Sequence, residues 1–163
     1  AAQHLLDDGL QRVAILDLGP HHGHGTQHIF DKRADVLFAS IHLDPQAAYP
    51  WYAGHAAEIG AGAGLHHTMN LPLAEGTGGA QWFAALETSC VKLAMFRPEA
   101  LVVSLGGDLA AHFALDGGDF LRIGERIAHL GLPAAFVFEG LDHVDAAAGT
   151  HLVNVLEGFE TAA

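Results

Sequence analysis

Short apolar runs recur along this chain and are separated by longer stretches with a helical pattern. The apolar runs predict five strands, at residues 12–17, 36–42, 67–71, 100–105 and 134–138. All of them except the third are continuously apolar, which is typical of strands buried on both faces of a parallel sheet. We therefore expect a mostly parallel sheet of about five strands.

Helical patterns fill the intervals between these runs. They cover residues 1–8, 26–33, 79–96, 118–130 and 144–160, and Gly9 ends the first of them. Alternating strands and helices predict a three-layer α/β/α sandwich of the Rossmann-like kind, with right-handed crossovers. No internal repeat or linker divides the chain, so residues 1–163 are expected to form a single domain.

Composition narrows the classes of function. Half of the 163 residues are hydrophobic and 16% are charged, as in a globular protein. Seven Lys and Arg against nineteen Asp and Glu give a net charge of -12, which argues against a nucleic-acid partner. No apolar run approaches the roughly 20 residues of a membrane span, and no charged-then-apolar leader opens the chain. With the single Cys90, expected to be buried, this predicts a cytoplasmic protein without a membrane partner.

A polar segment rich in His and Gly follows the first predicted strand directly. Residues 17–27 read Asp-Leu-Gly-Pro-His-His-Gly-His-Gly-Thr-Gln. Open α/β sheets build their sites at the carboxyl ends of strands, so we expect the functional site here. Residues 44–64, rich in Gly, Ala and Pro, predict a long loop beside it.

This segment resembles the Asp-x-Asp-x-His-His-Gly-Asn-Gly-Thr-Gln signature of the histone deacetylase and acetylpolyamine amidohydrolase family, which has the arginase–deacetylase fold. Further motifs of that family follow in order: Ser-Ile-His at 40–42, Asn-Leu-Pro-Leu at 70–73, the strand that ends in Asp108, Asp-Phe-Leu-Arg-Ile-Gly at 119–124 and Glu-Gly at 139–140. The resemblance spans nearly the whole chain but only the C-terminal part of that family's domain. The family's upstream segment with two tandem histidines has no counterpart here, so the chain resembles a truncated core.

The resemblance implies a zinc-dependent amide hydrolase in which His21 and Asp108 are metal ligands. Gly19 stands where the family has a third, aspartate ligand. Asp142 replaces the family's tyrosine, which hydrogen-bonds the reacting oxyanion, and either Asp142 or His112 is a candidate third ligand. His143 is a further candidate.

Several other histidines have more than one possible role. His22, the second histidine of the signature, is a candidate catalytic residue by resemblance, and a packing role is the alternative. For His24 and His28 a structural or surface role is favoured over metal binding. His66 and His67 follow each other along a predicted strand or its edge, so their side chains are expected to point apart.

The resemblance also implies a potassium site. Asp17 and Ser40 stand at family positions that bind a monovalent cation, with Ile41 as a carbonyl donor. Oxygen ligands suit such a hard cation. The alternative is that Asp17 caps the loop by accepting backbone N–H groups.

The sequence supports two hypotheses about the function of this chain. The first is a deacetylase-like core for a small acylated substrate, with little or no native deacetylase activity because of Gly19 and Asp142. The second is an engineered or degenerate α/β scaffold that has no metal or substrate, or a pocket remodelled for another ligand. A hydrolase needs stoichiometric metal, whereas a scaffold folds without it. In both cases exposed sheet edges or helix faces predict a homo-oligomer.

Overall fold

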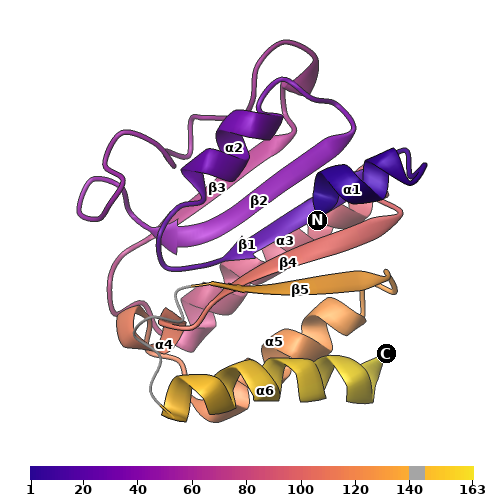
Figure 1. Ribbon diagram of the computed structural model, residues 1–163. Coiled ribbons are helices and arrows are strands. Elements are labelled where there is room, and N and C mark those ends of the chain that lie inside the picture. Colours follow the sequence, from indigo (N-terminus) through magenta and orange to yellow (C-terminus); the bar gives the residue numbers. More distant parts are fainter. Residues whose placement is uncertain (140–145) are drawn as a thin grey trace.

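The first apolar run forms β1 (Val13–Leu18), the middle strand of a five-stranded parallel sheet. The computed structural model describes residues 1–139 and 146–163. The other strands are β2 (Val36–Leu43), β3 (Thr68–Leu73), β4 (Ala100–Gly106) and β5 (Ala134–Glu139), and the sheet order is β3-β2-β1-β4-β5 (Figure 1). Every residue of β1 and β2 is buried, so their unbroken apolar runs match their position.

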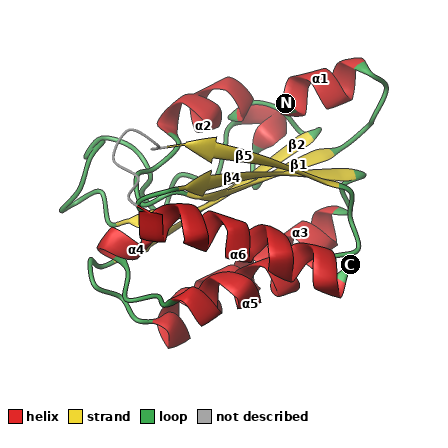
Figure 2. Ribbon diagram, turned by 60° about the horizontal axis from the view of Figure 1, so that its bottom comes forward, coloured by secondary structure: helices red, strands yellow, loops and turns green. Residues whose placement is uncertain are grey.

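Helices cover both faces of the sheet. They are α1 (Ala2–Asp7), α2 (His24–Phe30), α3 (Gly79–Phe96), the short α4 (Leu109–His112), α5 (Gly117–Ala128) and α6 (Ala146–Ala162), with a 3-10 turn at Gly62–Gly64. In Figure 2, α1 and α2 lie on one face, and α3, α5 and α6 lie on the other. The three-layer α/β/α sandwich and the five-stranded parallel sheet are therefore confirmed.

Most strand boundaries lie within one or two residues of the sequence prediction. The predicted helix at 26–33 begins and ends earlier, and α4 was not predicted. The predicted start of the last helix, residue 144, lies outside the described residues.

Cys90 on α3 is buried as expected, and burial raises the pKa of its thiol to about 11. None of the described helices is both long and apolar enough to cross a membrane.

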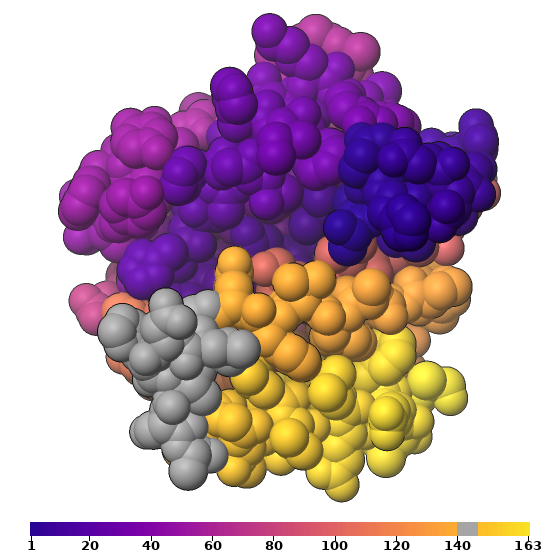
Figure 3. All heavy atoms as spheres, viewed as in Figure 1, coloured from indigo at the N-terminus to yellow at the C-terminus, as the bar shows by residue number. Residues whose placement is uncertain are grey.

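β5 corrects one prediction, because it is not buried on both faces. Its side chains alternate between half-buried and exposed, and Val137 is 43% exposed. β5 lies at the edge of the sheet, where among the described strands it pairs only with β4. Phe136 packs against Phe159 of α6 on one face, while the other face runs open across the surface between α1 and α6 (Figure 3). A continuous apolar run cannot distinguish a central strand from an edge strand of this kind.

Two glycines allow α5 and α6 to pack at close range. A Cβ at Gly124 would collide with the carbonyl oxygen of Val155, and a Cβ at Gly158 would collide with the carbonyl oxygen of Leu121. The backbone atoms that block these positions cannot move aside as a flexible side chain would. The contact between the two helices therefore requires residues without a side chain.

We expect Gly124→Ala to lower the free energy of unfolding by about 2–3 kcal/mol, because the added methyl group forces the two helices apart. Gly149→Ala is the matched control, since a Cβ there meets nothing within 4 Å. That substitution should raise stability by up to about 1 kcal/mol through helix propensity. Urea unfolding measures both changes, and equal effects of the two substitutions would contradict the packing argument.

Candidate active site

A cleft of about 400 Å3 opens at the carboxyl ends of the central strands. The loop after β1 and the first turn of α2, residues 19–26, form one wall, and Gly106, Asp108 and Glu139 at the ends of β4 and β5 complete it. This is the edge of the sheet at which the sequence predicted the site.

His21 and Asp108 lie side by side in this cleft. Nδ1 of His21 is 3.8 Å from Oδ2 of Asp108, and Nε2 of His112 is 4.0 Å from the same oxygen. The rings of His21 and His112 meet edge to face, with 5.5 Å between their centroids. Nδ1 of His112 also lies 3.4 Å from Glu75. The structure thus brings together three of the predicted residues, whereas Asp142 and His143 lie outside the described residues.

The described residues do not provide the three protein ligands that a catalytic zinc ion ordinarily has. Within residues 1–139 and 146–163, no three side chains of His, Cys, Asp or Glu are placed to share a metal ion. Gly19 contributes no side chain, and a Cβ there would lie 2.9 Å from Oε1 of Glu139. That Glu139 oxygen accepts a hydrogen bond from the hydroxyl of Ser104 at 2.9 Å. Glu139 therefore occupies the space beside Gly19, a position that the sequence analysis did not assign to the site.

Asp17 is the penultimate residue of β1, next to this loop, and is 3% exposed. Its Oδ1 accepts the backbone N–H of Gly19 at 3.1 Å, as the capping alternative predicted. Burial, together with the negative charge of Glu139, raises the pKa of Asp17 to about 7, although the hydrogen bond from Gly19 acts in the opposite direction. Ser40 pairs with Asp17 in register across β1 and β2, and the Ser40 hydroxyl lies 2.8 Å from Nδ1 of His42.

His22 contributes to the wall of the cleft, but its side chain is almost entirely buried. It is 3% exposed, and its Nε2 lies 3.0 Å from Oε1 of Gln27. The ring lies 4.6 Å from that of His42 between centroids, and burial lowers the pKa of His22. These contacts favour the packing role among the two alternatives. Nδ1 of His22 is buried without a hydrogen-bond partner among the described residues.

A buried polar network that the sequence did not reveal holds the long loop against the sheet. Gln27 donates to Glu58 at 2.6 Å and accepts from Asn70 at 2.8 Å. Glu58 accepts the backbone N–H of Gly54 at 3.1 Å. Nε2 of His42 lies 2.9 Å from the carbonyl oxygen of Gly54. A carbonyl oxygen only accepts, so Nε2 carries the proton and Nδ1 accepts from Ser40.

Aromatic side chains from this loop line the rim of the cleft. The ring of Tyr49 lies edge to face with His21 and His24, at 6.4 and 5.7 Å between centroids. His24 also meets Tyr52, whose side chain is largely exposed, as is that of Trp51. His24 therefore packs among aromatic rings, in agreement with a structural role.

The fold and the cleft together define a class of protein, because several motifs that carry the resemblance lie at the carboxyl ends of the strands: residues 17–27, 40–42, 70–73 and Asp108. A family model described as "Histone deacetylase domain" matches residues 1–140, and the chain belongs to this family. The family is generally metal-dependent.

The nearer relatives are amidohydrolases. The chain is 53% identical over 168 residues to acetylpolyamine amidohydrolase 1 of Pseudomonas aeruginosa, covering 100% of this chain and 48% of the relative. It is 45% identical over 163 residues to the acetylpolyamine amidohydrolase of Mycoplana ramosa, covering 97% and 48%. The crystal structure of an acetylpolyamine aminohydrolase from Burkholderia pseudomallei superposes with a TM-score of 0.92 at 38% identity, covering 99% and 48%. The chain thus spans about half the length of these relatives.

The buried His42 predicts a pH dependence of stability. Burial lowers the pKa of His42 from 6.5 to about 4, so the folded protein keeps the ring neutral while the unfolded chain protonates it near pH 6.5. The free energy of unfolding should therefore fall as the pH drops from 6.5 to about 4, by up to about 3 kcal/mol, and level off below that.

Urea unfolding across this pH range measures the loss in the native protein and in two variants. His42→Gln, which cannot titrate, should flatten the profile, while the exposed His4→Gln should leave it unchanged. An identical slope in the native protein and His42→Gln would show that other groups cause the loss.

Proposed function

We propose that this chain is an amidohydrolase-like core of the histone deacetylase family with little or no native deacetylase activity. The observation that carries this proposal is the donor set, since His21 and Asp108 are adjacent but Gly19 supplies no third side chain. A catalytic zinc site ordinarily has three protein ligands and one open position. Two ligands would hold a divalent metal weakly, and His112 is the nearest described side chain that could assist them.

The substrate class proposed for the cleft is a small acylated amine. The cleft lies beside the acidic groups Asp108 and Glu139, and the chain carries a net charge of -12, both of which favour a cationic molecule. The acetylpolyamine names of the relatives support the same class.

A second candidate is a non-catalytic scaffold with no metal. It is supported by the donor set, because no three His, Cys, Asp or Glu side chains within residues 1–139 and 146–163 are placed to share a metal ion. The two candidates differ in whether a divalent metal binds with one-to-one stoichiometry.

Zinc titration of the chelator-stripped protein tests the first candidate. The native chain should bind one zinc weakly, and Asp108→Ala should weaken binding by about tenfold or more because one of two donors is lost. Gly19→Asp should strengthen it by restoring a third donor, once Glu139 has moved aside. Asp7→Ala, on α1 away from the cleft, is the control and should change nothing.

Several results would contradict this candidate. A folded protein that binds no zinc would favour the scaffold, and zinc binding unchanged in Asp108→Ala would place the metal among other histidines. Rapid, chelator-sensitive hydrolysis of an acetylated polyamine by the native chain would overturn the proposed loss of activity.

We also propose that a potassium ion binds at Asp17, Ser40 and the carbonyl of Ile41. Asp17 is a buried carboxylate close to the second carboxylate of Glu139, an arrangement that a cation would stabilise. Potassium chloride should raise Tm by about 3 °C or more relative to tetramethylammonium chloride at equal ionic strength. Asp17→Asn should abolish the difference, and a difference that persists in this variant would exclude the site.

We further propose that the chain forms homo-oligomers through the β5 edge. β5 presents an unprotected apolar edge strand in the described chain, without the Lys or Pro that commonly guards such an edge. Analytical ultracentrifugation at rising concentration should show association that Val137→Lys reverses. Val153→Lys, at an exposed position on α6, is the matched control. If only that control dissociates the oligomer, a helix face forms the contact instead.

For location we propose the cytoplasm, supported by the free, buried thiol of Cys90. Cell fractionation with recovery of the chain in a periplasmic or membrane fraction would contradict it.

A further inference from the structure

The few cations of this acidic chain are unevenly distributed. Three of the seven Lys and Arg residues form ion pairs with carboxylates: Arg33 with Asp35, Arg122 with Asp119, and Arg126 with Glu87. The remaining four have no ion pair with a described carboxylate: Arg12, Lys32, Lys92 and Arg97. Two of these four, Arg12 and Lys92, line the same hollow of about 420 Å3.

This hollow, called here the basic pocket, lies at the edge of the sheet opposite the candidate active site. It is formed by Arg12 before β1, Lys92, Met95 and Phe96 near the end of α3, and His66 and His67 before β3. The strands all begin at this edge and end at the other, so the pocket is separate from the cleft of His21 and Asp108.

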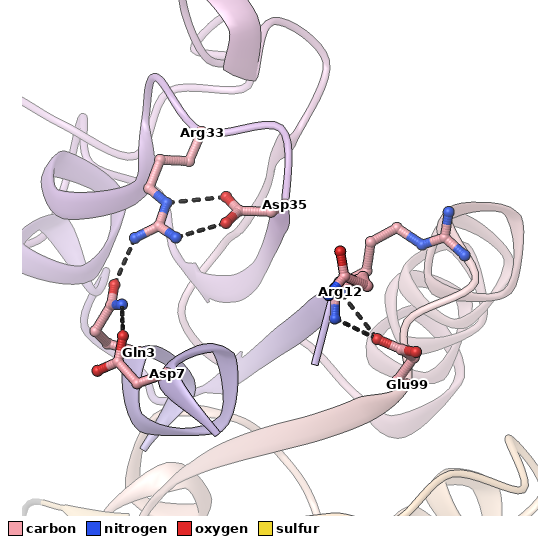
Figure 4. A network of polar contacts seen from close by, with 7 residues as sticks. Gln3, Asp7, Arg12, Arg33, Asp35 and Glu99 are labelled. Carbon is pink, nitrogen blue, oxygen red and sulfur yellow. Dashed lines mark hydrogen bonds and ion pairs between the residues drawn. The ribbon is translucent and has the colours of Figure 1, made fainter. Parts of the chain in front are cut away.

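The guanidinium of Arg12 is available for a ligand. The nearby carboxylate of Glu99 accepts the backbone N–H groups of Gln11 and Arg12 instead of the side chain. Figure 4 shows the Arg12 guanidinium extending away from Glu99, whereas Arg33 in the same view is bound to both oxygens of Asp35. The only hydrogen bond of the Arg12 side chain among the described residues runs from Nε to the carbonyl of Arg97, at 3.0 Å.

Both histidines of the pair contribute to the wall of the basic pocket. β3 begins only at Thr68, and His66 has a φ of 69°, in the left-handed region. That conformation is uncommon for a residue with a Cβ, and strained positions of this kind cluster at functional sites. The His67 ring packs edge to face on Phe96, 5.4 Å between centroids. The lining of the basic pocket therefore combines two histidines, Arg12 and Lys92 with the apolar residues Ala34, Leu37, Met95 and Phe96.

Negative groups near the pocket do not cancel its charge. The carboxyl end of α3 contributes a partial charge of about -0.5, and Glu99 contributes one carboxylate. Against them stand the full charges of Arg12, Lys92 and the neighbouring Arg97. The last turn of α3 carries no basic residue, so stabilisation of the helix end does not explain why Arg12 and Lys92 line the hollow.

We propose that the basic pocket binds a small organic anion that carries a phosphate or carboxylate group next to an apolar portion. Arg12 binds the oxygens of the anionic group through paired N–H groups and Lys92 adds a point charge. The apolar portion packs on Met95 and Phe96.

Phenyl phosphate is the probe, and its binding is followed by chemical-shift changes of backbone amides in the native protein. Amides of residues 12, 66, 67 and 92–97 should shift saturably, while those of the cleft at residues 19–26 should not. Phenol and inorganic phosphate should each bind more weakly than phenyl phosphate, because each offers only half of the recognised chemistry. Phenylacetate distinguishes carboxylate from phosphate as the preferred anionic group.

Arg12→Gln and Lys92→Gln should each weaken phenyl phosphate binding by about tenfold. Lys32→Gln removes the same charge from an exposed position outside the pocket and should change the affinity less than about twofold. Equal weakening in all three variants would reduce the effect to net charge, and absence of saturable shifts at the pocket would overturn the proposal.

His66→Gly separates function from stability. Glycine adopts a positive φ without steric cost, so this variant should raise Tm while it weakens phenyl phosphate binding. If His66→Gly gains stability and keeps full affinity for phenyl phosphate, His66 is not part of the site. If Arg12→Gln and Lys92→Gln also keep full affinity, the basic pocket does not bind this anion and the proposal is wrong.

Discussion

The complete burial of β1 between two parallel neighbours is the constraint on which the other features depend. A strand that is buried on both faces must direct its polar residues to its ends, because backbone and apolar side chains fill the interior. The segment after β1 therefore meets the ends of β4 and β5 at one edge of the sheet. The Asp17 carboxylate, which accepts the N–H of Gly19, sets the course of that segment at its first turn.

The candidate active site combines the architecture of the histone deacetylase family with an incomplete set of metal donors among the described residues. His21 follows β1 and Asp108 follows β4, and their side chains lie within 4 Å of each other. At Gly19 the space next to the loop is taken by Glu139, an acceptor for Ser104 and a second negative charge near Asp17. The local chemistry is therefore acidic and suited to holding cations, while catalysis of amide hydrolysis would demand donors beyond those described.

The two ends of the sheet differ in charge. Carboxylates gather with histidines at the carboxyl ends of the strands, whereas two unpaired cations line the basic pocket at the amino ends. In a chain with a net charge of -12, this segregation cannot arise from an excess of cations. The two ends differ because Arg33, Arg122 and Arg126 pair with carboxylates elsewhere on the surface, whereas Arg12 and Lys92 have no such ion pair among the described residues.

The sequence by itself determined the element order, the parallel sheet and the position of the site, because apolar runs, helical periodicity and the polar segment at 17–27 are all local signals. It could not decide that β5 is an open edge, since an apolar run reads alike at the edge and at the centre of a sheet. Nor could it place Glu139 beside Gly19 or join His42 to Gly54, contacts that arise only when distant segments pack. Tertiary structure alone brought His66 and His67 into one pocket wall with Arg12 and the end of α3, because these segments are far apart in the sequence.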